Sequence, residues 1–137
     1  MAHVPKLDMP LEEIRSELDR LRGPLRIAVQ RAKNPFNVGA IIRVAHSFMV
    51  REIILIGDAP YYRRASMGME KYEHLRSVPD EQAFLDLAAE QGQRLVVLER
   101  DRATGNLWDG DMPLDCTLVF GNEDTGVCDT ICDAAEQ

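Results

Sequence analysis

Two short stretches of this 137-residue chain combine residue types that can do chemistry. The first runs from Asn37 through Gly39 to Arg43, and it joins an amide, a glycine that lets the backbone approach a ligand closely, and a guanidinium. Arg43 lies between two apolar residues, where a guanidinium needs an anion or another polar partner because burying it alone is costly. Asn37 is also a good helix N-cap, so a capped helix with one solvated arginine is the simpler interpretation.

The second stretch is residues 121–126 (GNEDTG), which follow an apolar run that ends at Phe120. A turn of this kind exposes backbone amides and a carboxylate, and it suits an uncharged or cationic small molecule. Glu123 and Asp124 would repel a phosphate, and neither GxGxxG nor GxxxxGK occurs, so dinucleotide and P-loop functions are not indicated. An ordinary strand-to-helix turn is the simpler interpretation of these residues.

A third group, residues 61–64 (YYRR), places two aromatic rings beside two guanidinium groups. RNA-binding surfaces use this combination of stacking and positive charge. We find no Ser-His-Asp arrangement of a hydrolase. Cys128 and Cys132 have neither a nearby His nor a second Cys pair, so we expect no metal site.

The elements that must position these groups follow from hydrophobic spacing. We expect strands at 25–29, 53–56, 94–99 and 116–120. We expect helices at 8–22 (capped by Asp8), 38–49 and 80–91, and a further helix that begins at 125. Residues 59–79 are expected to form a long loop with one short helical turn. Alternation of strands and helices predicts an α/β fold with a parallel sheet and helices on both faces. Ligands of such sheets bind beyond the carboxyl ends of the strands, so the turns after Val29, Leu98 and Phe120 are the ones to examine.

Composition limits the protein class. With 45% hydrophobic and 28% charged residues, the chain reads as one globular core over 25–137 with an N-terminal helical extension over 1–24. No apolar run approaches the ~20 residues of a membrane span, and three cysteines favour a reduced, cytoplasmic setting. Residues 1–80 hold 13 basic and 10 acidic residues, whereas 81–137 hold 3 and 13. A nucleic acid would therefore contact the N-terminal half.

Taken together, Asn37–Arg43 and Leu118–Gly126 resemble the first and second motifs of the SpoU/TrmH class of SPOUT RNA methyltransferases. The separation of about eighty residues between the motifs is also similar to the family's pattern, as are Val96–Glu99, the run from Phe48 to Gly57, and the loop Ala65–Glu70. The similarity covers roughly residues 25–130.

This resemblance implies a SPOUT-type core with a trefoil knot, S-adenosyl-L-methionine as cofactor, a homodimer, and methyl transfer to a ribose 2′-hydroxyl of tRNA or rRNA. Carried over by position, Arg43 would activate the hydroxyl, Asn37 would assist it, and Glu123 would organise the site. The cofactor-binding candidates are Leu98, Glu99, Gly121, Asn122 and Gly126. The RNA-binding candidates are Arg63, Arg64, Lys71 and Lys33. We favour tRNA because no separate RNA-recognition domain accompanies the core.

The third motif of the family is absent, so we expect that the knot-forming C-terminal segment is missing from this chain, and this fragment can by itself be inactive. Two alternatives remain open. One is a catalytically silent RNA-binding module of the same fold. The other is an unrelated flavodoxin-like regulatory or nucleotide-binding domain, against which the combination of Asn37, Arg43 and Glu123 argues.

Overall fold

The computed structural model describes residues 8–57, 61 and 63–135, and for Arg63 the backbone alone. Five parallel strands form one sheet in the order β3-β2-β1-β5-β4. The strands are β1 (Arg26–Gln30), β2 (Glu52–Ile56), β3 (Leu75–Val78), β4 (Arg94–Leu98) and β5 (Cys116–Phe120). The helices are α1 (Leu11–Asp19), α2 (Pro35–Ser47), α3 (Arg63–Ser66), the 3-10 turn η1 (Met69–Lys71), α4 (Glu81–Glu90) and α5 (Asp129–Ala134).

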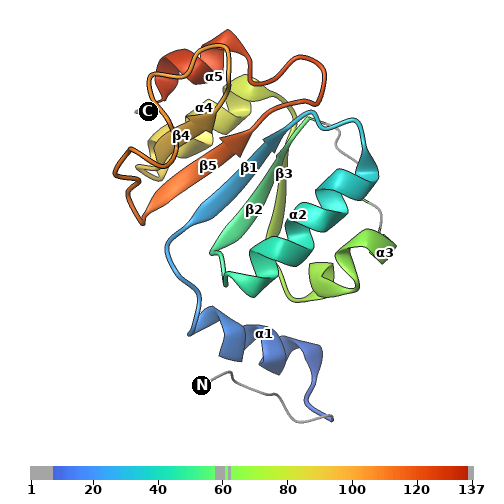
Figure 1. The fold of residues 1–137 in the computed structure, drawn as a ribbon. Coiled ribbons are helices and arrows are strands. Elements are labelled where there is room, and N and C mark those ends of the chain that lie inside the picture. Colours follow the sequence, from blue (N-terminus) through green and yellow to red (C-terminus); the bar gives the residue numbers. More distant parts are fainter. Residues whose placement is uncertain (1–7, 58–60, 62, 136–137) are drawn as a thin grey trace.

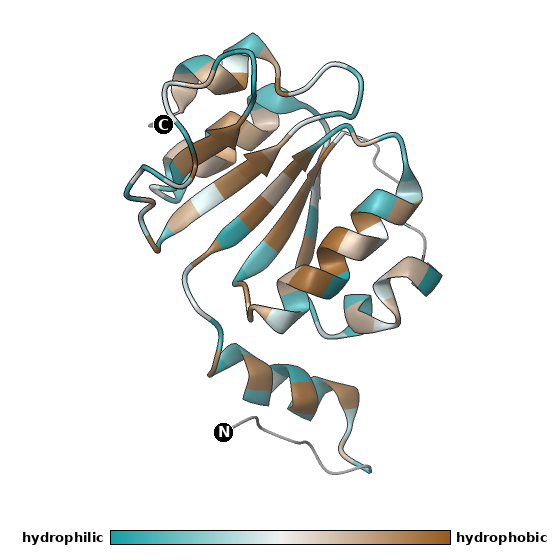
Figure 2. Ribbon diagram, in the orientation of Figure 1, coloured by the Kyte–Doolittle hydropathy of each residue, from teal (hydrophilic) through white to brown (hydrophobic). Residues whose placement is uncertain are grey.

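Helices cover both faces of the sheet, as the alternating pattern predicts. Figure 1 shows α2 and α3 on one side and α4 and α5 on the other. Successive residues of a strand point to opposite faces, so Ile53 and Leu55 join the core under α2 whereas Ile54 and Ile56 join the core under α4 and α5. Figure 2 shows the resulting apolar strands between the two layers of helices, with hydrophobic residues also prominent on α2.

The order of the strands creates a switch point between β1 and β5. From β1 the chain adds β2 and β3 on one side, whereas β4 and β5 lie on the other. The turns that follow β1 and β5 therefore leave the sheet side by side. In parallel sheets this crevice is the usual place for a ligand.

Several predicted boundaries differ from the structure. The 59–79 segment holds α3, η1 and the edge strand β3, which we did not predict because Leu75-Arg76-Ser77-Val78 is short and half polar. Helix α2 begins at Pro35 and is capped by Asn34, whose side chain accepts a hydrogen bond from the Phe36 amide, so Asn37 is not the cap. The first helix begins after Pro10, without a cap from Asp8, and the last begins at Asp129.

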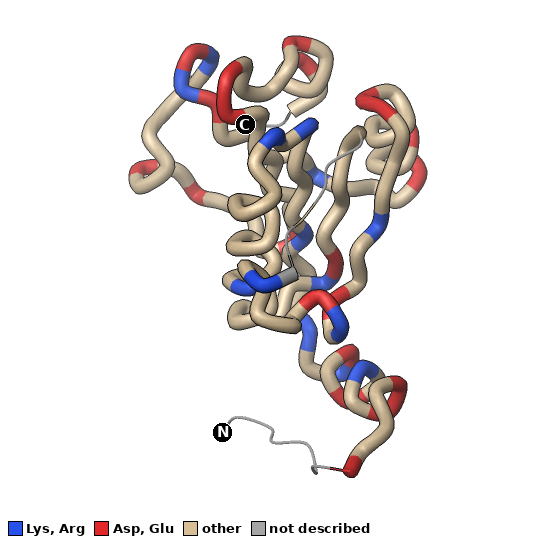
Figure 3. Tube along the Cα trace, turned by 90° about the vertical axis from the view of Figure 1, so that its right-hand side faces the viewer, with Lys and Arg blue, Asp and Glu red and all other residues tan. Residues whose placement is uncertain are grey.

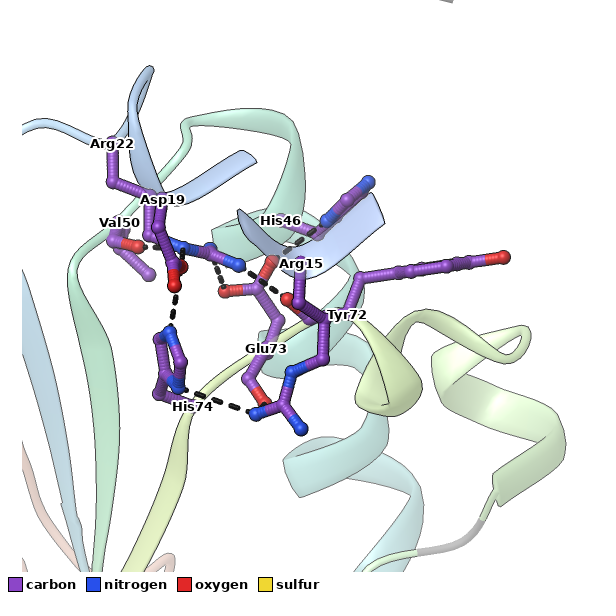
Figure 4. A network of polar contacts seen from close by, with 8 residues as sticks. All are labelled: Arg15, Asp19, Arg22, His46, Val50, Tyr72, Glu73 and His74. Atoms are coloured by element: carbon purple, nitrogen blue, oxygen red, sulfur yellow. Dashed lines mark hydrogen bonds and ion pairs between the residues drawn. The ribbon is translucent and has the colours of Figure 1, made fainter. Parts of the chain in front are cut away.

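Helix α1 lies beside the end of the sheet that is opposite the switch point (Figure 1). It is attached through Glu73, whose side chain is fully buried between α1, α2 and β3 (Figure 4). The Glu73 carboxylate accepts from Arg22 Nη1 at 2.8 Å and forms a second hydrogen bond, of 2.7 Å, with His46 Nδ1. Arg22 also donates to the Val50 and Tyr72 carbonyls. A charged contact just after α1 therefore connects this helix to the core, together with the buried Leu18.

Candidate active site at the carboxyl ends of β1 and β5

Glu123 is the central group of the switch point. Its carboxylate accepts three hydrogen bonds, from the Lys33 amide at 2.9 Å, the Asn34 amide at 3.2 Å and Asn37 Nδ2 at 3.2 Å. All three donors lie in the turn after β1 or in the first turn of α2, some ninety positions earlier in the chain. The structure thus brings Asn37 and Glu123 together.

These hydrogen bonds extend the pH range over which Glu123 is ionised. Chiefly the Lys33 amide, with help from Asn37 and Asn34, lowers the pKa of this carboxyl from its ordinary value near 4.5 to about 2. At neutral pH the group is a firmly ionised carboxylate. A carboxylate of such low basicity is a poor general base, so its role here is to hold the turn and the start of α2 in place.

The turn that presents Glu123 is closed by its own backbone. Asn122 and Gly126 exchange two hydrogen bonds, Asn122 N to Gly126 O at 3.1 Å and Gly126 N to Asn122 O at 2.8 Å. The Asn122 side chain fastens the turn to β1 by donating to the Arg31 carbonyl at 2.6 Å. A Cβ on Gly121 would overlap the backbone of Gly126, and a Cβ on Gly126 would overlap the Glu99 carboxylate. Only glycine fits at these two positions.

Glu99 connects this turn to the end of β4. Its carboxylate accepts from the Val127 amide at 2.7 Å and from the Asp101 amide at 3.2 Å. Because Val127 directly follows Gly126, the loops after β4 and β5 are fastened to each other. Glu99 is therefore a structural link between the two candidate cofactor-binding segments.

A cavity of about 450 Å³ opens on the other side of Glu99. It is lined by the end of β4, the loop after it and α5, with Leu98, Glu99, Arg102, Leu107, Met112 and Cys132 among the lining residues. Two of the predicted cofactor-binding residues, Leu98 and Glu99, lie in its wall. Gly121, Asn122 and Gly126 are not in the wall, and they act through the turn that Glu99 holds. The volume of the cavity is that of a pocket for a small molecule.

Arg43 lies apart from Asn37 and Glu123. Asn37 and Arg43 are six positions apart in α2, which is roughly 9 Å along the helix axis. The Asn37 side chain donates a hydrogen bond to Glu123. Arg43 Nη1 instead donates to the sulfur of Met67 at 3.3 Å. The Arg43 side chain is exposed although its sequence neighbours are apolar, so its guanidinium does not need an anion to offset burial. Sequence reasoning did not single out Met67, although the loop that contains it resembles the family's pattern.

The four RNA-binding candidates have different surroundings. Arg64 and Lys71 are exposed beside α2, and Lys33 forms an ion pair with Asp124 that raises the pKa of its ammonium group. The side chain of Arg63, like all of Tyr62, lies outside the described residues. Figure 3 shows Lys and Arg close to Asp and Glu along α1 and the loop after β4.

Within residues 8–57, 61 and 63–135, no three His, Cys, Asp or Glu side chains gather in a way that could bind a metal ion. No helix in the same part of the chain is long and apolar enough to cross a membrane.

Comparison with known proteins gives a family. The model of the SpoU rRNA methylase family matches residues 24–137. None of the curated proteins matches this sequence. Similar solved structures include an A. aeolicus TrmH/SpoU tRNA modifying enzyme, with a TM-score of 0.77 and 22% identity over 93% of this chain.

Two further structures are alike in fold. The AviRb SpoU methyltransferase from Streptomyces viridochromogenes in complex with AdoMet has a TM-score of 0.71 and 21% identity over 84% of this chain. A protein studied for 2-OH methylation of C/U34 on tRNA has a TM-score of 0.71 and 21% identity over 82% of this chain. This chain spans 66%, 47% and 78% of the lengths of the three proteins. At such identities the similarity establishes a shared fold.

Proposed function

The chain belongs to the SpoU rRNA methylase family, and from this premise we propose that it transfers a methyl group from S-adenosyl-L-methionine to a ribose 2′-hydroxyl of RNA. The observation that carries the proposal is the junction of the loops after β1, β4 and β5. There Glu123 holds the start of α2, and Glu99 holds the wall of the adjoining cavity.

The residues of the cavity suit this cofactor. Its volume of about 450 Å³ accommodates a nucleoside with an amino-acid side arm. Val97 and Leu98 supply backbone groups at the end of β4 for the base, and Asp109 supplies negative charge for a sulfonium. Burial raises the pKa of the Cys132 thiol, which keeps this lining group neutral. When bound, the cofactor supplies an electrophilic methyl group.

The residues of the chain then have separate tasks. Arginine stays protonated in proteins, so Arg43 acts by charge: its guanidinium stabilises the alkoxide that develops on the 2′-oxygen as the methyl group transfers. Asn37 and Glu123 fix the first turn of α2, the helix that presents Arg43. We place the RNA over α3 and η1, beside the Arg43 side of α2, where Arg64 and Lys71 contact phosphates.

We propose tRNA as the substrate class, because two of the three structural relatives above are described as acting on tRNA. We also propose a homodimer and a cytoplasmic setting. The homodimer is supported by the outer face of α2, where Phe36, Val44 and Phe48 are about half to three-quarters exposed on the side opposite the buried Val38 and Ile42.

Titration of S-adenosyl-L-methionine, followed by calorimetry and by the fluorescence of Trp108, tests the proposal first. Trp108 is the single tryptophan of the chain and adjoins two cavity-lining residues, Leu107 and Asp109. We expect micromolar binding, abolished in Ala103→Trp, which fills the cavity, and unchanged in Arg100→Ala, whose exposed side chain is not in the cavity wall. Absence of binding would contradict the proposed cofactor.

Transfer of labelled methyl groups to tRNA and rRNA is the second step, with digestion of the RNA to detect 2′-O-methyl nucleosides. We expect Arg43→Ala to lose methyl transfer while cofactor affinity stays within a few-fold. RNA binding without cofactor binding or transfer would instead support the silent RNA-binding module of the same fold.

A further inference from the structure

The guanidinium of Arg43 is held by an unusual partner. Its Nη1 donates to the thioether sulfur of Met67 at 3.3 Å, and Met67 lies 24 positions further along the chain, in the turn between α3 and η1. Helix α3 packs against α2, so this turn lies beside the outer face from which Arg43 projects. A thioether is a weak acceptor without charge.

The backbone at Met67 is in a conformation that an unbranched side chain rarely adopts. Its φ is 54°, and Gly68 follows with a φ of 81°, so two left-handed residues stand in succession. Such a conformation costs a non-glycine residue of order 1 kcal/mol, and it persists only where the surrounding structure imposes it. Glycine would fit the same backbone at lower cost.

The surroundings do impose it. Ser66, which precedes Met67, is fully buried, and its hydroxyl donates to the Glu70 carboxylate on the far side of the turn. The amides of Met67 and Lys71 donate to the carbonyls of Arg64 and Gly68. With its backbone held in this way, Met67 has a 64% exposed side chain that lies against the Arg43 guanidinium.

A neutral acceptor has a specific advantage at this place. A carboxylate opposite Arg43 would form a charge-assisted, bidentate pair and cancel the charge that the reaction needs. A thioether orients one N–H group and leaves the positive charge and the other donors available. We propose that Met67 is the positioning residue that holds the Arg43 guanidinium in the site with its charge uncompensated. This inference rests on the proposed role of Arg43 in methyl transfer.

Three substitutions separate the parts of this proposal. Met67→Leu keeps the size and removes the acceptor, Met67→Gln keeps a neutral acceptor, and Met67→Glu adds a negative charge. We expect kcat to fall about threefold to tenfold in Met67→Leu, as for one lost hydrogen bond, with the KM for S-adenosyl-L-methionine unchanged. Met67→Gln should recover most of the loss, and Met67→Glu should lose more than Met67→Leu. Met69→Leu, in the same turn but packed against the core, is the matched control and should leave kcat unchanged.

A readout that does not depend on activity accompanies the kinetics. In the full chain labelled at the methionine methyl groups and at arginine nitrogen, we expect Arg43→Gln to shift the Met67 methyl resonance and to leave that of Met112 in place. The Arg43 Nε–H should become more mobile in Met67→Leu and regain its order in Met67→Gln.

The two readouts distinguish the failures. If the unaltered chain transfers no methyl group, the proposed function fails, and the spectra alone decide the contact. If methyl transfer occurs but Met67→Leu has the kcat of the unaltered chain, or if the mobility of Arg43 does not change in that variant, the positioning role is overturned.

Discussion

At the scale of single residues, the candidate site depends on groups whose state is set by a few hydrogen bonds. The pKa of Glu123 is lowered because backbone amides of the β1–α2 turn donate to its carboxylate. A Cβ on Gly121 would overlap the backbone of its own turn at Gly126 and Val127, and a Cβ on Gly126 would overlap the Glu99 carboxylate from the loop after β4. Both features can be tested without any knowledge of the substrate.

The depressed pKa of Glu123 predicts a dependence of stability on acid. Its pKa is about 2 in the folded chain and near the ordinary 4.5 in the unfolded chain, so the unfolded state binds the proton more readily. The contribution of Glu123 to stability is fully present above about pH 4.5 and is lost as the pH falls toward about 2. Carboxyl NMR titration should give the low value directly, and Glu123→Gln should flatten the acid side of the stability profile between these two values. A titration midpoint near 4.5 would contradict the three hydrogen bonds.

Because Gly126 lies close to the Glu99 carboxylate, we predict that adding one methyl group at this position lowers the stability of the fold. In Gly126→Ala the new Cβ overlaps the Glu99 carboxylate, and the φ of 69° is unfavourable for alanine, so we expect a loss of about 1–3 kcal/mol in the free energy of unfolding. Gly105→Ala is the control, since nothing lies within 4 Å of its Cβ position. Urea denaturation of both variants is the measurement, and equal stabilities would show that the loop can move away.

At the scale of elements, polar contacts fix how helices meet the sheet. Arg31 and Glu81 form an ion pair between the end of β1 and the start of α4, and Gln30 Nε2 donates to the same carboxylate at 3.0 Å. This hydrogen bonding, led by Arg31, lowers the pKa of Glu81 to about 2. At the opposite end of the sheet, Glu73 joins α1 and α2 in a similar way, through its contacts with Arg22 and His46.

The buried pair of Arg22 and Glu73 predicts that α1 is attached by charge. Their side chains are 4% and 0% exposed, so Glu73→Gln removes the buried counter-charge of Arg22 and leaves the half-exposed Asp19 as its remaining carboxylate partner. We expect the variant to lose about 3–5 kcal/mol in the free energy of unfolding. The double variant Arg22→Met/Glu73→Gln should lose less than the two single variants combined, because the two residues interact.

The exposed pair of Arg20 and Glu17 in the same part of the chain supplies the control, and Arg20→Ala should change stability by less than about 1 kcal/mol. Denaturant unfolding of Arg22→Met, Glu73→Gln, their double variant and Arg20→Ala measures how α1 is attached. Additive losses in the double variant would mean that α1 is held mainly by its apolar side, through Leu18.

At the scale of the whole molecule, the parallel sheet places the loops after β1, β4 and β5 at one end and leaves the outer face of α2 uncovered in the single chain. An exposed apolar stripe next to Arg43 is the feature that supports self-association. Because the stripe and Arg43 lie on one helix, a partner chain on this face would adjoin the site.

Self-association through α2 can be measured by sedimentation over a range of concentrations. We expect a dimer whose Kd rises at least about tenfold in Phe48→Glu, because the substitution places a charge within an apolar contact. Leu114→Glu is the matched control, since Leu114 is similarly exposed but lies on the loop before β5. A monomer at every concentration, or equal effects of the two substitutions, would contradict the proposed interface.

Much of the architecture was predictable from local pattern. The apolar runs identified four of the five strands, and the alternation of strands with helices predicted the parallel sheet and its two covered faces. The edge strand β3 was missed because an edge position tolerates polar residues, so its sequence lacks the continuous apolar run of β1 or β2. The N-terminal boundary of α2 was misplaced because Asn34 and Asn37 are both suitable caps, and only the backbone at Pro35 decides between them.

The sequence by itself determined the order of four strands and the longer helices, the positions of the two motifs and hence the family to which the chain belongs. The tertiary structure alone decided which side chains meet: Asn37 with Glu123, Arg43 with Met67, and Glu73 with Arg22 and His46. The physical reason is that hydrophobic spacing and capping act over a few neighbouring residues. The charge of a carboxylate and the orientation of a guanidinium depend instead on donors and acceptors that only the order of the strands in the sheet brings within 3 Å or so.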